Sequence, residues 1–191
     1  MPYPTIVGID PSLSETGFVR IDGNRDHGQI IPSAPAGDAW AARYARLSGI
    51  AATLVDLTPP GSLVVIEAPA YSRVQGHVHD RSGLWWTIYH ALVMQRQAVM
   101  YPVTVQHRMR YATGKGTAKK DEVLAAAIRR YHWADIRNNN IADAYLLADI
   151  GARLDGHSLV PSVPKACWPL PKLDPFPAAP EASPFADRPY V

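Results

Sequence analysis

The segment Thr5-Ile6-Val7-Gly8-Ile9, with Asp10 directly after it, is an apolar, β-branched run that predicts a short buried strand ending in a carboxylate. The run Phe18-Val19-Arg20-Ile21 has strand alternation, and Asp22-Gly23-Asn24 supplies turn residues after it. Gln29-Ile30-Ile31 is a plausible third strand. These runs predict that the chain opens with an antiparallel meander of three strands.

Helix and strand signals alternate through the residues that follow. Residues 39–57 repeat apolar side chains at helical spacing, with Asp38 as the expected N-cap and Pro59-Pro60-Gly61 as the stop. The other expected elements are a strand at 63–66, a helix at 81–98, a strand at 103–105, a helix at 117–131 capped by Thr117, and a last helix from Asn138 or Asn139 to 154. This order predicts an α/β fold, in which a mixed β-sheet combines the antiparallel meander with parallel strands and is flanked by helices.

Composition separates a globular body from a proline-rich end. The chain has 191 residues, 47% of them hydrophobic, and its one cysteine, Cys167, rules out an internal disulfide framework. We expect no signal peptide and no membrane span, because no apolar run reaches the required length. Nine of the 18 prolines lie in residues 157–191. We therefore predict a folded domain at 1–156 and an extended or disordered tail at 157–191, which could bind an unidentified partner.

Positive charge is concentrated in one part of the chain. The formal net charge is only +2, but residues 105–130 carry seven Lys and Arg against two Asp and Glu. Clustering of this kind is typical of a surface that binds phosphates, and it is equally typical of a solvated helix face. Charge alone leaves both interpretations open.

Carboxylates follow the two strongest predicted strands. Asp10 comes directly after the first strand, and Glu67 comes directly after Leu63-Val64-Val65-Ile66. Each acid taken alone could simply begin a loop. If the two strands are neighbours, however, the carboxylates meet at one sheet edge and repel each other unless a cation lies between them.

The last predicted helix adds a third acid. Asn140 and Asp143 are three residues apart and therefore project from one helix face, while Asp149 lies roughly 240° further round the helix and should point elsewhere. Carboxylate and amide oxygens are hard ligands that suit Mg²⁺ or Mn²⁺ better than zinc. The pattern predicts a metal site built from Asp10, Glu67 and this helix.

The sequence resembles the RuvC-like Holliday junction resolvases of the ribonuclease H-like superfamily, with a phage-type member as one candidate. The matching blocks, in the order of the family, are Gly8-Ile9-Asp10-Pro11-Ser12 with Thr16-Gly17, then Val65-Ile66-Glu67, then Gly114-Lys115-Gly116-Thr117-Ala118-Lys119-Lys120, then Ala142-Asp143-Ala144. Together they span about residues 4–154. The resemblance implies a ribonuclease H-like fold and a cytoplasmic protein of a bacterial or phage-infected cell.

The resemblance also implies an activity and a site. It implies metal-dependent hydrolysis of DNA phosphodiesters in four-way and other branched junctions by a homodimer, through two Mg²⁺ ions for which Mn²⁺ substitutes. Asp10, Glu67 and Asp143 match the metal-binding carboxylates, and Lys120 matches the lysine near the scissile phosphate. Asn140 stands where many members carry another acid, so the second metal site should be weaker.

The remaining site candidates concern DNA. Tyr71 could stack on an unpaired junction base or pack on the body of the protein. The other candidates for phosphate contact are Arg108, Arg110, Lys115, Lys119 and Thr117. His77 and His79 are spaced like a pair of metal ligands, but we do not assign them to a metal site. The competing functions are a nuclease of the same superfamily that acts on RNA or flaps, an actin-like ATPase or kinase, and a junction-binding protein without catalysis.

Overall fold

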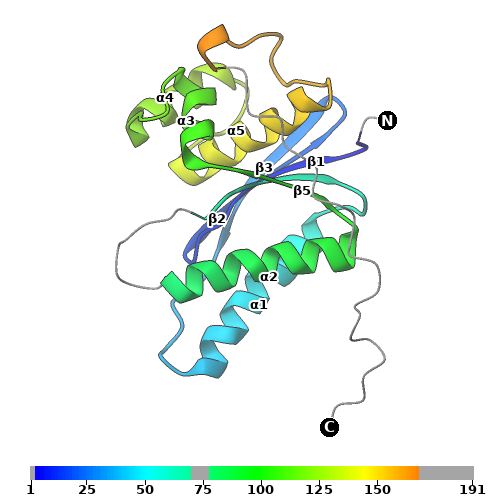
Figure 1. The fold of residues 1–191 in the computed structure, drawn as a ribbon, viewed down its shortest axis with the longest axis vertical. Coiled ribbons are helices and arrows are strands. Elements are labelled where there is room, and N and C mark those ends of the chain that lie inside the picture. The colour runs from blue at the N-terminus through cyan, green and yellow to red at the C-terminus, as the bar shows by residue number, and fades with distance from the viewer. Residues whose placement is uncertain (1–2, 70–77, 168–191) are drawn as a thin grey trace.

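A single five-stranded sheet forms the centre of the molecule in the computed structural model, which describes residues 3–69 and 78–167. The strand order is β3-β2-β1-β4-β5. Helices cover both faces of this sheet (Figure 1). The strands are β1 (Ile6–Asp10), β2 (Glu15–Asp22), β3 (Arg25–Pro32), β4 (Leu63–Glu67) and β5 (Val99–Val103). The predicted mixed sheet is confirmed, because β1, β2 and β3 form an antiparallel meander while β1, β4 and β5 run parallel.

Strand alternation divides the core into two clusters, one on each face of the sheet. On one face Ile9 and Ile66 pack against α1 (Trp40–Leu57) and α2 (Val78–Arg96). On the other face Val65 packs against the remaining helices, which are α3 (Val105–Thr113), α4 (Lys120–Arg130) and α5 (Asn139–Leu154). Figure 1 shows these two helical layers on opposite sides of the strands. Since successive residues of a strand point to opposite faces, a five-residue apolar strand such as β4 supplies both cores.

The region after α2 differs from the sequence-based expectation. The predicted strand at 103–105 was wrong in position, because β5 ends at Val103 and a helix that the sequence did not predict, α3, begins at Val105. Because proline is normally excluded from central strands, Pro102 argued against a strand at 99–103 in the sequence. β5 tolerates this proline because it lies at the edge of the sheet. Thr104 caps α3 by accepting a hydrogen bond from the backbone N–H of His107.

Other helix ends differ by a few residues. α1 begins at Trp40 after Ala39, so the predicted cap Asp38 lies one residue too early. α2 starts at Val78 and ends at Arg96. α4 begins at Lys120 with Lys119 at the N-cap position, so the predicted cap Thr117 is wrong. The expected cap of α5 is confirmed, since the Asn138 side chain accepts from the backbone N–H of Ile141.

The first residues after α5 pack onto the body. The backbone N–H of Leu159 donates to Asp149 at 2.9 Å, Val160 is buried, and a short 3-10 helix, η1 (Lys165–Cys167), contacts α3. The domain boundary after residue 156 stays a prediction, and residues 168–191 lie outside the described part of the chain. Within the described part, no helix combines the length and apolarity needed to cross a bilayer.

Candidate active site

Three carboxylates from distant parts of the chain line one cleft. β1 and β4 are parallel neighbours in which Ile9 pairs with Ile66, so Asp10 and Glu67 end adjacent strands at the same edge. Asp143 reaches the same cleft from α5. The cleft has a volume of about 570 Å³, and its lining also includes Asn140 from α5, Lys120 from the start of α4 and Arg108 from α3. The residues predicted as catalytic or metal-binding therefore lie together.

Glycines in β1 and β2 let α5 come close enough to deliver Asp143. A Cβ atom added to Gly8 would lie 2.2 Å from the carbonyl oxygen of Ala144, and one added to Gly17 would lie 2.0 Å from that of Asn140. Ala144 and Ala148 face the strands from the helix with small side chains. The separation between α5 and the sheet, and hence between Asp143 and Asp10, depends on the missing side chains at positions 8 and 17.

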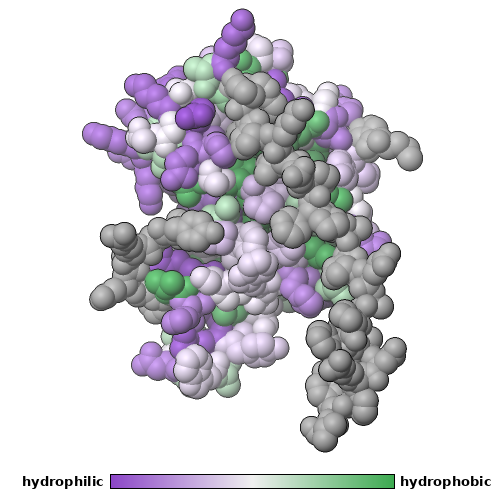
Figure 2. Space-filling view, viewed as in Figure 1, coloured by the Kyte–Doolittle hydropathy of each residue, from purple (hydrophilic) through white to green (hydrophobic). Residues whose placement is uncertain are grey.

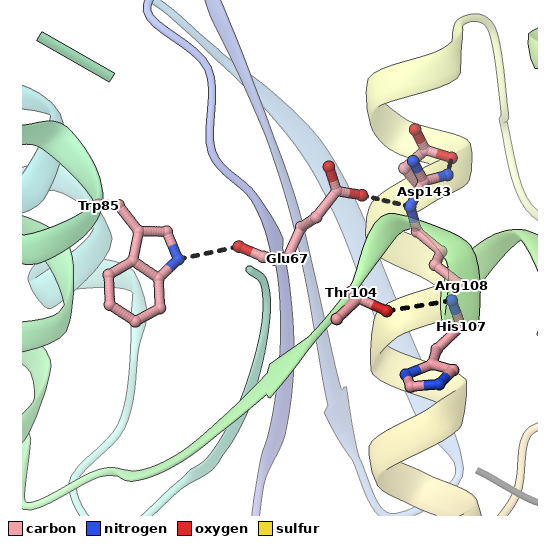
Figure 3. Close-up of polar contacts among 6 residues, drawn as sticks. All are labelled: Glu67, Trp85, Thr104, His107, Arg108 and Asp143. Carbon is pink, nitrogen blue, oxygen red and sulfur yellow. Dashed lines mark hydrogen bonds and ion pairs between the residues drawn. The ribbon is translucent and has the colours of Figure 1, made fainter. Parts of the chain in front are cut away.

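Arg108 occupies the middle of the acidic cluster. Its Nε donates to Glu67 Oε2 at 2.5 Å and its Nη1 donates to Asp143 Oδ1, so the guanidinium bridges the two acids (Figure 3). Its side chain is only 7% exposed. From its sequence Arg108 is a candidate for phosphate contact, whereas in the structure it pairs with the carboxylates.

Burial and mutual repulsion raise the pKa values of two of the carboxylates, Asp10 and Asp143. Burial raises the pKa of Asp10 well above its usual value, and the nearby charges of Glu67 and Asp143 raise it further. Burial likewise raises the pKa of Asp143 to about 7, although the charge of Arg108 opposes the shift. Burial disfavours the charged form of Arg108, but the surrounding carboxylates outweigh this effect and raise its pKa. One arginine therefore does not fully compensate the three acids.

The donor set has the chemistry of a divalent-metal site, and Arg108 modifies it. Asp10, Glu67 and Asp143 offer hard oxygens in a partly enclosed cleft, as Mg²⁺ prefers. In residues 3–69 and 78–167, however, no three His, Cys, Asp or Glu side chains are grouped as a ready ligand set. Two of the three carboxylates, those of Glu67 and Asp143, pair with Arg108 instead. The residues therefore fit an ion that shares these carboxylates with Arg108.

The other predicted site residues are Asn140, which lines the cleft, and several exposed residues that do not. The Asn140 amide contacts Glu15 Oε2 at 3.4 Å. The exposed candidates on α3 and the loop that follows it are Arg110, Lys115, Thr117 and Lys119, none of which lines the cleft. Hydrophilic side chains gather over α3 and α4 in Figure 2. Tyr71 and His77 lie outside the described residues, and Asp149 points away from the cleft into the helical layer, as expected.

Two residues of the cleft wall were not singled out from the sequence as part of the site. Trp85 is buried and donates from Nε1 to the backbone oxygen of Glu67 at 2.8 Å, which holds the end of β4 (Figure 3). Arg81 also lines the cleft. Of the adjacent residues Trp85 and Trp86, only Trp85 is in the core, and Trp86 is exposed. A sequence signal for Trp85 existed in its helical spacing with Ile88 and Leu92, which are also buried.

The sheet order, the flanking helices and the acids at the ends of β1 and β4 define a ribonuclease H-like fold of the RuvC-like kind. Known protein-family models do not match this chain, and curated proteins do not match it either. Solved structures similar to it include two of a RuvC protein. The structure of Thermus thermophilus RuvC matches with a TM-score of 0.61 at 17% identity, over 80% of this chain and 97% of that one. The structure of T. thermophilus RuvC in complex with a Holliday junction substrate matches with a TM-score of 0.58 at 20% identity, over 76% and 91%. This likeness confirms the predicted RuvC-like fold.

Proposed function

We propose that this protein is a metal-dependent, structure-selective endonuclease that hydrolyses DNA phosphodiesters in Holliday or other branched junctions. The observation that carries the proposal is the convergence of Asp10, Glu67 and Asp143 in one cleft of a RuvC-like fold. A second support is that one similar structure holds a Holliday junction substrate. Fold alone does not determine activity, so the site has to carry the argument.

The charge distribution fits a polyanionic substrate. The acidic cleft lies beside the basic segment of residues 105–130, in which Arg110, Lys115 and Lys119 are exposed. Exposed cations beside the cleft would bind the DNA backbone and hold it against its own repulsion from the carboxylates. Such contacts position a strand without reading its sequence.

The acids would hold the divalent ion. Asp10, Glu67 and Asp143 would bind Mg²⁺, with Mn²⁺ as a substitute and Asn140 as a neutral fourth ligand. When bound, such an ion lowers the pKa of the attacking water and stabilises the charge that builds on the phosphoryl and leaving oxygens. In the reaction the water oxygen bonds to phosphorus, the bond from phosphorus to the 3′ oxygen breaks, and a proton from water ends on that oxygen.

Lys120 would act on the scissile phosphate. It is exposed, lines the cleft, and is the first residue of α4, where the partial positive charge of the helix N-terminus adds to that of its ammonium group. Both charges favour the extra negative charge of the transition state over that of the ground state. Lys120 therefore contributes to rate more than to binding.

A homodimer would present two clefts to the two strands that a resolvase cuts. Exposed aromatic side chains on the α1 and α2 layer, Trp40, Tyr44 and Trp86, support self-association through these helices. Light scattering on the purified protein measures the mass, and a Trp86→Ser variant should shift it towards the monomer. A wild-type monomer at micromolar concentration would remove this part of the proposal.

A substrate panel tests the proposed activity. The full chain is incubated in Mg²⁺, Mn²⁺ or EDTA with labelled four-way junction, flap, linear duplex and RNA hybrid, and Asp10→Asn serves as the control for contaminating nuclease. We expect nicks in the junction that require the divalent ion and leave the duplex intact. Preference for flap or RNA would assign a different substrate within the superfamily, and junction binding without cleavage in either ion would make the protein a silent junction binder.

A further inference from the structure

The position of Arg108 has a consequence for how many cations the cleft can hold. The cleft contains three carboxylates, and the fourth position, where many RuvC-like sequences carry another acid, is the neutral Asn140. Arg108 lies inside the cluster, in contact with Glu67 and Asp143. When ionised, the three acids and the arginine that pairs with two of them carry a net charge of about minus two, which one divalent cation neutralises. Lys120, which also lines the cleft, adds a further positive charge that disfavours a second cation.

We propose, on the basis of the function proposed above, that Arg108 takes the place of one of the two metal ions that the resemblance to RuvC-like resolvases implies, so that the DNA-free site binds a single divalent cation beside a resident guanidinium. Arg108 is then a positioning residue, because it acts through the carboxylates that it orients. A second divalent ion would enter a cluster whose negative charge is already neutralised, and nothing would offset the loss of its hydration shell.

The arginine is built into the fold and is not a mobile surface group. Thr104 caps the start of α3. One turn beyond Arg108, the hydroxyl of Tyr111 donates to the buried carboxyl of Asp149 at 2.7 Å, and the hydroxyl of Tyr131, the C-cap residue of α4, donates to the same oxygen at 2.9 Å. α3 is therefore tied to α5 one turn beyond the arginine, and the end of α4 is tied to the same carboxyl. Withdrawing the guanidinium would leave two buried carboxylates without their partner.

Enough oxygen ligands remain for one ion. Arg108 uses Oε2 of Glu67 and Oδ1 of Asp143, so the second oxygen of each carboxylate is left for another ligand. Within the described residues the Asp10 carboxyl takes part in no hydrogen bond or ion pair, whereas Arg108 pairs with both other acids. Asp10 is accordingly the centre of the remaining cation site.

Counting bound Mn²⁺ tests the proposal without using catalysis. Purified full-length protein is titrated with Mn²⁺ in the absence of DNA, and free Mn²⁺ is read from its electron paramagnetic resonance signal. We expect one ion per chain in the wild type and in Arg108→Lys, which keeps the positive charge. The double variant Arg108→Gln with Asn140→Asp restores four carboxylates without the arginine, and we expect two ions per chain.

Arg110→Gln is the matched control, because it removes the same charge from the same helix outside the cleft. It should bind one ion. Thermal unfolding provides a second measurement in case a variant folds poorly: Arg108→Gln should melt below the wild type in EDTA and regain more of its melting temperature on addition of Mn²⁺. Two ions in the wild type, none in the wild type, or one in the double variant would each overturn the proposal. Junction cleavage in the separate substrate panel would still support the nuclease.

Discussion

Gly17 on β2 lies directly under the start of α5, with no space for a side chain between its Cα atom and the carbonyl group of Asn140. A Cβ atom there would be 2.0 Å from the carbonyl oxygen and 2.7 Å from the carbonyl carbon. Because these are backbone atoms, the clash cannot be relieved by a rotamer change. Gly17 also pairs with Asp10 across the β1–β2 ladder, so the same residue sets the distance between one acid and the helix that carries another.

Gly17→Ala should therefore push α5 away from the sheet. We expect a loss of about 3 kcal/mol or more in the free energy of unfolding, measured by urea denaturation, together with loss of cleavage. Gly49→Ala is the matched control, since Gly49 lies in an exposed part of α1 with nothing near its missing Cβ atom. The control should gain about 0.5–1 kcal/mol from helix propensity. A stable, active Gly17→Ala protein would show that α5 does not depend on this contact.

Neutralising any of the three acids should remove cleavage and spare binding. Asp10→Asn, Glu67→Gln and Asp143→Asn keep the side-chain shape and delete one charged ligand, so we expect cleavage rates to fall by at least about 10²-fold. Junction affinity in EDTA, measured by gel shift, should hold or improve because the cleft becomes less negative. Turnover near the wild-type rate in any one variant would count heavily against the proposed site.

Lys120→Ala separates chemistry from binding. If Lys120 stabilises charge that develops on the phosphate, single-turnover cleavage should slow by about 10²-fold, while junction affinity should change only by the few-fold expected for one lost phosphate contact. Lys119→Ala is the control, because Lys119 is adjacent, exposed and outside the cleft. Equal losses of rate and affinity for Lys120→Ala would reduce its role to positioning the DNA backbone.

The meeting of the acids could be predicted from sequence because it depends on simple periodicities. Apolar strands that end in Asp10 and Glu67 become neighbours in a parallel pair, and the spacing of Asn140 and Asp143 puts both on one helix face. The place of Arg108 could not be predicted in this way. A buried arginine looks polar in any hydropathy pattern, so α3, whose buried residues are Arg108, Tyr111 and Ala112, had no recognisable apolar face.

β5 escaped prediction for a different physical reason. Its sequence, Val99-Met100-Tyr101-Pro102-Val103, contains a proline that argues against a central strand, and only the sheet order shows that the strand lies at an edge. Position in a sheet is a property of the whole chain, so a local pattern cannot supply it. The shift of the predicted strand to 103–105 also concealed the helix that begins at Val105.

Alkaline pH should unfold the protein through its buried tyrosines. Burial, followed by the nearby carboxyl of Asp149, raises the pKa of Tyr131 well above its ordinary value of 10.0, and the pKa of Tyr111 is raised for the same reasons. Both groups stay protonated in the folded state, whereas the unfolded chain ionises them near pH 10. The stability they contribute is complete below pH 10 and declines as the pH rises further.

The measurement is the melting temperature between neutral pH and strongly alkaline pH, followed together with tyrosinate absorbance. We expect a steep fall above pH 10 and a tyrosinate signal that appears in part only on unfolding. Tyr131→Phe should lower the starting stability and flatten the fall, because one linked group is gone. Tyr44→Phe, at a side chain 72% exposed, should change neither. An unaltered slope in Tyr131→Phe would mean that this hydroxyl ionises normally in the folded protein.

Two truncations distinguish the proline-rich segment from the residues that precede it. Removing 157–191 deletes Ser158 and Leu159, which supply both donors to Oδ1 of the buried Asp149, and it also deletes the buried Val160. Loss of these contacts should cost about 2–4 kcal/mol in the free energy of unfolding. Removing only 168–191 keeps all of them and serves as the matched control, so its melting temperature and junction cleavage should equal those of the full chain. If both truncations melt alike, the contacts to Asp149 carry no measurable stability, and the helical layer that holds Arg108 is secured by α3, α4 and α5 alone.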